Sequence, residues 1–514
     1  MKHNQLFLYL GMGSSLLTAC THKQKATTEN TRPNVIFIVA DDIGFGDLSC
    51  NGSTTIQTPN VERLANKGMR FTDAHSVAAT STPSRYALFT GEYSWRRNDT
   101  GIAAGNAGMV IRPEQTTVAD LFQDKGYVTG AVGKWHLGLS DRTGGQDWNG
   151  FITPGPADIG FQYSYIMAAT GDRVPCVWVE NQRVVNLDPN DPIEVSYREP
   201  FEGEPLGKDH PEMLYKLRPS LNHGHDQAIV NGISRIGYMK GGKAALWEDE
   251  NIADSITHHA VEFIRNNKDN PFFLYVGTND IHVPRYPHKR FEGKSGMGKR
   301  GDAILSFDWT VGCVLDALEE AGIVDNTLVI LTSDNGPVVD DGYADQAVEL
   351  LGEHKPWAEF RGGKYSSFEA GTRVPFVVSW PAVVKPGVSH ALVSQIDLYA
   401  SMAALLGSEE SVTDIKDSRN YLNTLLGNEQ EGRPYIIEAA YSLSVSDGKW
   451  KYIETSKAAA YNTLTNTELG NSPEPQLYHL ATDIGEQQNV ANQYPEKVEE
   501  LKNILASERE KSKK

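Results

Sequence analysis

Residues 34–42, NVIFIVADD, are a run of apolar, mostly β-branched side chains that ends in two aspartates. A strand that is apolar on both faces is typical of a parallel sheet covered by helices on both sides. The pattern of an apolar run followed by polar residues recurs at YVTGAVG (127–133), PFFLYVG (271–277) and TLVILTS (327–333). The sequence therefore predicts an α/β domain over residues 33–405, with a parallel sheet between helices.

Polar side chains follow each of the four predicted strands. They are Asp41 and Asp42 after the first, Lys134 and His136 after the second, His282 after the third, and Asp334 and Asn335 after the fourth. Ligands of open α/β sheets bind beyond the carboxyl ends of the strands. One aspartate pair alone is more typical of a helix cap or a turn. Two pairs of oxygen ligands favour a calcium or magnesium site, because zinc prefers histidine and cysteine.

The overall charge limits the classes of partner that the chain can bind. The 514 residues carry a formal net charge of -18, whereas nucleic-acid-binding proteins present a basic face to phosphates. We therefore expect no nucleic-acid partner. A small anionic substrate remains compatible with this charge if the pocket is locally basic.

The N-terminus predicts export. Residues 1–20 contain Lys2, an apolar stretch too short to span a bilayer, and a Leu-Thr-Ala-Cys ending that resembles a bacterial lipobox. We expect a lipoprotein signal peptide, with lipidated Cys20 as the only membrane attachment and residues 21–32 as a polar tether. The protein would then lie in the periplasm or on the outer membrane or cell surface. The alternative is a plain signal peptide cut nearby.

Three further cysteines, Cys50, Cys176 and Cys313, are too few and too widely spaced for a disulfide framework or a zinc site. We interpret them as buried or incidental thiols.

Two regions differ in character from the apolar runs. Residues 140–250 are rich in Gly, Pro, Asp and aromatic residues, which favours long loops over the strand ends. Residues 434–514 predict a small C-terminal subdomain with an antiparallel sheet and one helix. Its signals are a hairpin turn at Asp447-Gly448 and a helix from Pro495 whose Val498, Leu501 and Leu505 share one face.

Several motifs together resemble the formylglycine-dependent sulfatases. They are STPSR (81–85) followed by Thr90-Gly91, VADDIGFGDL (39–48), VGKWHLG (132–138), TSDNGP (332–337), RGGKYSSFEAGTRVPF (361–376) and LYHLATDIGEQQNVA (477–491). The resemblance covers residues 32–485 in the order of the family. It implies an α/β fold, the alkaline phosphatase-like sandwich, with a large mixed, mostly parallel sheet between helices and a small C-terminal α+β subdomain.

The resemblance implies that Ser81 is oxidised to formylglycine, an aldehyde that hydrates to a geminal diol. A serine at this position implies an anaerobic-type maturase, because the oxygen-dependent route requires cysteine. The implied metal, calcium or magnesium, is bound by Asp41, Asp42, Ser81, Asp334 and Asn335. Such a metal would lower the pKa of the diol and polarise the sulfur.

The resemblance also implies the catalytic roles. Arg85 steadies the diol, and Lys134 and Lys364 hold sulfate oxygens. His282 protonates the leaving sugar oxygen, and His136 takes a proton from the second hydroxyl so that sulfate departs and the aldehyde returns. Two positions depart from the family pattern: Glu92 replaces a basic residue, and His282 lacks a preceding Pro-His pair.

The substrate is expected to be a sulfated saccharide. ATGDRVPCVWVEN (169–181) and LNHGHDQ (221–227) resemble exo-acting bacterial sulfatases that remove 6-O-sulfate from galactose or N-acetylgalactosamine. Asp172 and Arg173, with His223 or His225, could bind sugar hydroxyls, the alternative being a loop ion pair and surface histidines. Two other functions stay open: a phosphatase or phosphonate hydrolase of the same superfamily, and a lipid-anchored glycan-binding protein with unconverted Ser81.

Overall fold

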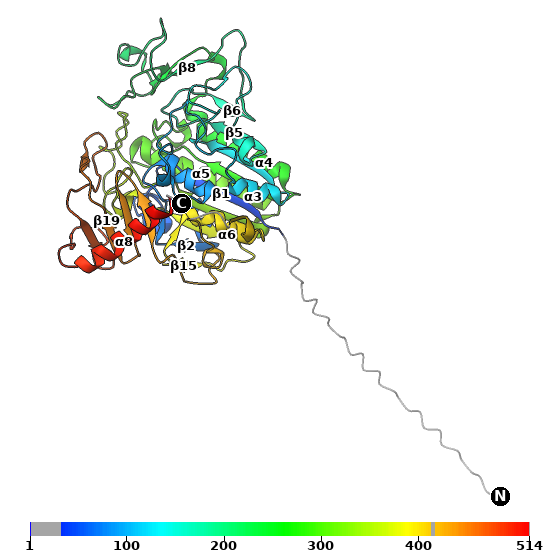
Figure 1. Ribbon diagram of the computed structural model, residues 1–514. Coiled ribbons are helices and arrows are strands. Elements are labelled where there is room, and N and C mark those ends of the chain that lie inside the picture. The colour runs from blue at the N-terminus through cyan, green and yellow to red at the C-terminus, as the bar shows by residue number, and fades with distance from the viewer. Residues whose placement is uncertain (2–31, 413–416, 513–514) are drawn as a thin grey trace. The chain divides into compact units, whose positions relative to one another are not determined.

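A computed structural model, shown in Figure 1, describes residues 1, 32–412 and 417–512. The predicted signal peptide, Cys20 and all of the tether except Arg32 lie outside the described residues. Residues 33–514 form one compact unit. Within the described ranges, no helix is long and apolar enough to cross a membrane.

The central sheet has ten strands in the described part of the chain, in the order β15-β2-β14-β13-β1-β12-β4-β5-β6-β7. Their bounds are β1 (Asn34–Ala40), β2 (Gly68–Phe71), β4 (Val128–Lys134), β5 (Tyr163–Met167), β6 (Trp178–Glu180), β7 (Arg183–Val184), β12 (Phe272–Gly277), β13 (Thr327–Ser333), β14 (Phe376–Ser379) and β15 (Gly387–Ser389). The four strands predicted from the apolar runs are confirmed as β1, β4, β12 and β13.

The middle of this sheet is parallel, and its edges are mixed. Strands β13, β1, β12, β4 and β5 run parallel, with Ile36 of β1 between Leu274 of β12 and Val329 of β13. Strand β14 runs antiparallel to both β13 and β2, and β6 and β7 run antiparallel to their neighbours. The carboxyl ends of β1, β4, β12 and β13 therefore meet at one edge of the sheet.

Helices cover both faces of the sheet. The helices within the described ranges are α1 (Pro59–Ala65), α2 (Ser81–Thr90), α3 (Val118–Asp124), α4 (Ile252–Asn267), α5 (Gly298–Glu320), α6 (Leu398–Leu405), α7 (Leu422–Leu425) and α8 (Pro495–Lys511). Helix α8 packs on the small C-terminal sheet instead. Phe272 of β12 packs on Phe263 of α4, while the next residue, Phe273, stacks on Phe122 of α3. Successive strand side chains point to opposite faces, so α3 and α4 lie on opposite sides. The predicted helix-sheet-helix sandwich is confirmed.

Residues 140–250 contain more sheet than the sequence predicted. Strands β5, β6 and β7 extend the central sheet, and β8 (Glu194–Ser196) pairs with β11 (Tyr238–Lys240). Strand β9 (Ile229–Val230) pairs with β10 (Ile233–Ser234). These strands have five residues at most, so their periodicity is too short to detect in the sequence. Aromatic contacts such as the stacked pair Tyr165 and Trp178, 4.7 Å apart, stabilise them instead.

The C-terminal residues form a four-stranded antiparallel sheet with helix α8. The strands are β17 (Ile436–Ala439), β18 (Leu443–Ser446), β19 (Trp450–Ile453) and β22 (Gln476–His479). Helix α8 begins at Pro495 as predicted, and Leu501 and Leu505 are buried. The hairpin turn lies one residue later than predicted: Gly448, with φ of +82°, and Lys449 are its central residues.

This small sheet supports the helix that carries Ser81. Val445 of β18 and Leu501 of α8 belong to the same buried apolar cluster as Ala87 of α2.

The remaining strands of the described chain form three pairs of two-residue strands: β3 (Ala74–His75) with β16 (Val393–Ser394), β9 with β10, and β20 (Tyr461–Asn462) with β21 (Thr467–Glu468). The domain bounds at residues 405 and 434 stay predictions. Cys50, Cys176 and Cys313 are free thiols, as expected.

Candidate active site

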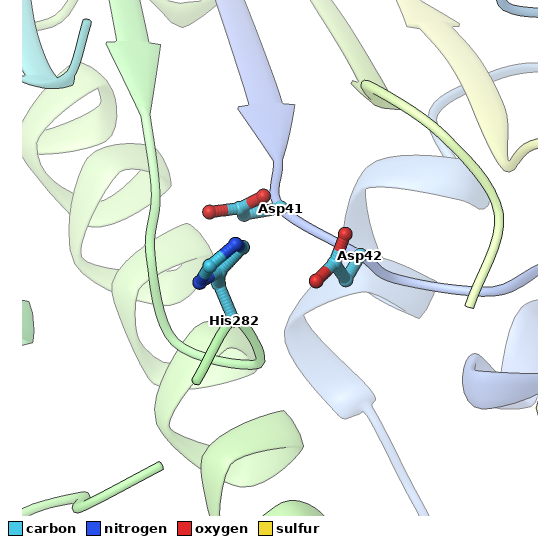
Figure 2. A group of neighbouring side chains, drawn as sticks. All are labelled: Asp41, Asp42 and His282. Atoms are coloured by element: carbon cyan, nitrogen blue, oxygen red, sulfur yellow. The ribbon is translucent and has the colours of Figure 1, made fainter. Parts of the chain in front are cut away.

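The site is built where the parallel strands end. Asp41 and Asp42 directly follow β1, and Asp334 follows the neighbouring strand β13, where its backbone N–H donates to the Ala40 carbonyl at 3.0 Å. Asp42 has φ of +60°, and its N–H donates to Asp334 Oδ1 at 3.3 Å. Figure 2 shows the carboxylates of Asp41 and Asp42 facing the ring of His282, which lies beyond β12.

The oxygen ligands predicted from the sequence come together and are buried. Asp41, Asp42, Asp334 and Asn335 are each at most 1% exposed. Asn335 Nδ2 donates to Asp42 Oδ1 at 2.8 Å. Among the described residues, the buried atoms Asp41 Oδ2 and Asn335 Oδ1 have no hydrogen-bond partner. Buried oxygens without partners are costly, so this set fits a hard divalent cation, whose preferred ligands are carboxylate and amide oxygens.

Two lysines flank these carboxylates. Lys134 Nζ lies 2.6 Å from Asp41 Oδ1, and Lys364 Nζ lies 2.8 Å from Asp42 Oδ2. Burial raises the pKa of Asp41 to about 8, and the nearby carboxylates of Asp334 and Asp42 add to the rise, against the opposing effect of Lys134. Asp41, Asp42 and Asp334 therefore share a buried site that disfavours their negative charge, and a bound cation would offset this.

Ser81 is the first residue of α2 and is almost fully buried. Its hydroxyl donates a hydrogen bond to Asp334 and accepts one from Lys134 Nζ at 2.6 Å. Arg85 lies one helical turn later on the same face, so its Nε reaches Ser81 Oγ at 3.3 Å and its Nη2 reaches Asp334 Oδ2 at 2.8 Å. Burial alone would raise the pKa of Asp334, but Arg85 and Lys134 outweigh it and lower that pKa to about 2.

The two predicted proton-transfer histidines are both buried and line one cavity. His136 has φ of +56°, and its Nε2 lies 3.0 Å from the Ala103 carbonyl, a contact that requires the proton on Nε2. Its Nδ1 has no partner among the described residues. The Nδ1 of His282 lies 2.7 Å from the carbonyl of Val283. Burial, followed by the charges of Lys134 and Lys364, respectively, lowers the pKa of each histidine well below its ordinary value.

A cavity of about 220 Å³ joins the reactive end of the site to the predicted sugar-binding residues. Its lining includes two groups of predicted residues: Ser81, His136, His282 and Lys364 for catalysis, and Asp172, Arg173, His223 and His225 for sugar binding. Asp172 accepts hydrogen bonds from Arg173 at 2.9 Å and His225 Nε2 at 3.0 Å. Burial would raise the pKa of Asp172, but Arg173 and His225 hold it well below its usual range. His223 is placed differently, because its Nε2 donates to the Leu464 carbonyl at 2.7 Å.

Sequence reasoning missed several residues of the site. Asp341 accepts hydrogen bonds from Lys364 Nζ at 3.0 Å and from the Tyr365 hydroxyl at 3.2 Å. Tyr275, inside β12, contacts Arg85. Asp341 follows the TSDNGP stretch by only four residues, and Tyr365 adjoins Lys364, so proximity to the motifs could have found them. Tyr275 lies in an apolar run. Its hydroxyl, a polar group in a predicted buried strand, was only a weak signal in the sequence.

Fold and site together define an enzyme of the α/β class that hydrolyses an anionic ester. A buried residue at a helix N-terminus contacts two cations, Lys134 and Arg85, and lies with hard oxygen ligands beside a cavity of sugar size. The sulfatase family model matches residues 33–408. The chain therefore belongs to the sulfatase family, is a sulfuric ester hydrolase and has the alkaline phosphatase-like fold.

Individual relatives support the same assignment. An N-acetylgalactosamine-6-O-sulfatase of Bacteroides thetaiotaomicron is 53% identical over 511 residues, which cover 99% of each chain. Human arylsulfatase A is 29% identical over 494 residues, covering 92% of this chain and 87% of its own. A solved structure from work on the metabolism of multiple glycosaminoglycans by Bacteroides thetaiotaomicron is 53% identical, with a TM-score of 0.91 over 93% of this chain and 99% of its own.

Proposed function

We propose that this enzyme removes 6-O-sulfate from terminal N-acetylgalactosamine or galactose of glycans, acting from the chain end. The observation that carries the proposal is the single cavity that joins Ser81 and its cations to Asp172, Arg173 and His225. Adjacent charged donors and an acceptor match the hydroxyl groups of a sugar. The relative that is 53% identical over nearly the whole chain is an N-acetylgalactosamine-6-O-sulfatase, which supports the same sugar.

Residue 81 is proposed to become formylglycine, made from the encoded serine by an anaerobic-type maturase. The hydrated aldehyde would supply a hydroxyl that attacks sulfur, which a serine could do only once, because its sulfate ester has no second hydroxyl to expel the sulfate. Arg85 and Lys134 already hold the side chain of residue 81 from two sides. These contacts fix the attacking oxygen and favour its negative charge.

The proposed metal is calcium, with magnesium as the alternative, held by Asp41, Asp42, Asp334, Asn335 and residue 81. When bound, it would lower the pKa of the attacking hydroxyl and withdraw charge from the sulfate. Lys134 and Lys364 lie at the two sides of this ligand set and are proposed to hold sulfate oxygens.

Proton transfer is assigned to the two histidines. The Ala103 carbonyl keeps the proton of His136 on Nε2, so Nδ1 is the free base that takes a proton from the second hydroxyl of residue 81. The Val283 carbonyl holds the Nδ1 proton of His282, so Nε2 gives a proton to the leaving sugar oxygen from the doubly protonated ring. The negative charge of a bound sulfate would raise the lowered pKa of His282 and favour that form. In each histidine the backbone carbonyl thus determines which ring nitrogen is left for proton transfer.

The test measures both the conversion of Ser81 to formylglycine and the release of sulfate from sugar substrates. The tryptic peptide of residues 71–85 from protein made with an anaerobic maturase should be lighter than the encoded peptide by two hydrogens. Sulfate release from 6-sulfated N-acetylgalactosamine and galactose should be measured on the same protein and should disappear in Ser81→Ala. An unmodified peptide from the native host, or release from phosphate esters exceeding that from both sugars, would contradict the proposal.

We also propose export with a lipid anchor at Cys20, which places the enzyme in the periplasm or on the outer membrane or cell surface. The support is the lipobox-like Leu-Thr-Ala-Cys ending of an apolar N-terminal stretch. Labelling with a fatty-acid analogue should mark the full-length protein in its bacterial host. A Cys20→Ala variant should lose the label, and labelling that persists in this variant would contradict the anchor.

A further inference from the structure

The outer wall of the sugar cavity comes from a hairpin near the C-terminus. Strands β20 (Tyr461–Asn462) and β21 (Thr467–Glu468) pair antiparallel, and the turn between them reaches the cavity. Asn462, Leu464 and Thr465 of this hairpin line the same cavity as Asp172 and His225, which precede it by more than 200 residues in the chain. The hairpin is therefore part of the sugar site that the sequence motifs did not reveal.

Two contacts fix the hairpin over the cavity. At its tip, the Leu464 carbonyl accepts the hydrogen bond from His223 Nε2 at 2.7 Å. At its base, Arg361 binds the Glu468 carboxylate with two hydrogen bonds of 2.7 and 2.9 Å. His223 is thus hydrogen-bonded to the hairpin backbone, whereas His225 is hydrogen-bonded to Asp172.

The side chains of the hairpin offer an apolar surface beside polar groups. Leu464 is 41% exposed although it lines the cavity, and Ile102, also in the lining, is 49% exposed. Thr465 is buried, and its hydroxyl has no partner among the described residues. A buried hydroxyl without a partner is costly, which points to a polar group of the substrate as its partner. The amide of Asn462 adds a donor, its Nδ2, because its Oδ1 already accepts a hydrogen bond from the Leu464 N–H at 3.0 Å.

We propose that the hairpin of residues 461–468 binds the 2-acetamido group of the sugar and that His223 is the positioning residue that holds it there. An acetamido group has a methyl for Leu464 and an amide for Thr465 and Asn462. A plain 2-hydroxyl, as in galactose, would leave Leu464 uncovered. The inference rests on the proposed 6-O-sulfatase function and assigns to the hairpin the preference for N-acetylgalactosamine over galactose.

The first experiment compares two isosteric substitutions in the hairpin. Thr465→Val removes the buried hydroxyl, and Thr463→Val makes the same change at an exposed position outside the cavity. We expect Thr465→Val to lower kcat/KM for 6-sulfated N-acetylgalactosamine about five- to tenfold and to change that for 6-sulfated galactose at most twofold. The Tm of Thr465→Val should equal or exceed that of Thr463→Val, because the lost hydroxyl has no partner in the free protein.

The second experiment tests whether His223 acts through the hairpin. In a variant with residues 462–466 replaced by Gly-Gly, the preference for N-acetylgalactosamine should fall about tenfold. Adding His223→Ala to that variant should change kcat/KM no further, whereas adding His225→Ala should still lower it, because His225 acts through Asp172.

The outcomes separate this inference from the function on which it rests. If the wild-type protein with converted residue 81 frees sulfate from neither sugar, the proposed function is wrong. If it frees sulfate but the Thr465→Val and Gly-Gly variants lose activity equally on both sugars, or lose none, the acetamido assignment is wrong. If His223→Ala lowers kcat/KM in the Gly-Gly variant as much as it does in the wild-type protein, His223 binds the sugar directly.

Discussion

The hydroxyl of Tyr275 accepts a hydrogen bond from Arg85 Nη1. The same hydroxyl donates to the main-chain carbonyl of Lys134 at 3.1 Å. Gly277 makes room for this arrangement, because a Cβ there would lie 2.5 Å from the Lys134 carbonyl oxygen and 2.7 Å from the Tyr275 hydroxyl. Tyr275 therefore contacts the guanidinium of Arg85 and the main chain of Lys134, the two residues whose cationic groups contact residue 81.

Tyr275→Phe should lower kcat for sulfate release about tenfold while leaving KM within about twofold. The change leaves a buried N–H of Arg85 without a partner, which costs about 1–3 kcal/mol, and it frees the guanidinium to shift away from residue 81. Kinetics should be normalised to the formylglycine content of each preparation by mass spectrometry.

Tyr399→Phe is the matched control for this change. Tyr399 is fully buried in α6, and its hydroxyl has no partner among the described residues. Its kcat should equal that of the wild type. Equal losses of kcat in both variants, or a rise in KM alone for Tyr275→Phe, would show that Tyr275 does not position the catalytic groups.

The strand framework and the ends of its strands could be predicted from the sequence because both depend on local patterns. Uninterrupted apolar runs identify β1, β4, β12 and β13, and the residues that follow them form the site in space. Contacts between distant segments leave no such pattern. The sequence allowed His223 or His225 beside Asp172, and only the fold shows that His225 contacts Asp172 while His223 contacts Leu464. The hairpin turn shifted by one residue because Gly448 suits more than one turn position.

Removal of divalent cations should abolish sulfate release and lower Tm. Without a cation, Asp41, Asp42 and Asp334 repel one another in a buried site, and Asp41 Oδ2 lacks a partner. Dialysis against a chelator, checked by elemental analysis, should reduce activity to the level of Ser81→Ala. Calcium should restore activity and raise Tm with concentration, and magnesium should restore less. Full activity of protein shown to be free of metal would contradict the metal site.

Asp172→Asn should lower kcat/KM for the sulfated sugar by roughly tenfold to a hundredfold. Asp172 holds both Arg173 and His225, and hydrogen bonds to charged groups contribute about 1.5–3 kcal/mol each. Asp226→Asn, one residue after His225, is the matched control, since Asp226 does not line the cavity. The effect should lie in kcat/KM for the sugar and leave the conversion of Ser81 unchanged. Comparable losses in the two variants would rule out a specific role for Asp172.

The pH dependence of stability should depend on His75, a buried residue that has no role in the proposed catalysis. Its Nδ1 lies 2.8 Å from Glu438, and its Nε2 lies 2.9 Å from Asp73. Burial alone would lower the pKa of His75, but these carboxylates raise it from 6.5 to about 9. The cluster also contains Lys451, which binds Glu369 and Glu438, so its carboxylates are already neutralised by protein cations.

Because the folded pKa of His75 lies above its ordinary value, the stabilisation is fully present below about pH 6.5 and is lost as pH rises to about 9. The shift corresponds to about 3 kcal/mol of unfolding free energy across this window. His75→Gln should lower stability at pH 6 and flatten the fall in Tm between pH 6.5 and 9, measured by calorimetry. His258→Gln, at an exposed position of α4, should keep the wild-type slope. An unchanged slope in His75→Gln would show that other groups set this pH dependence.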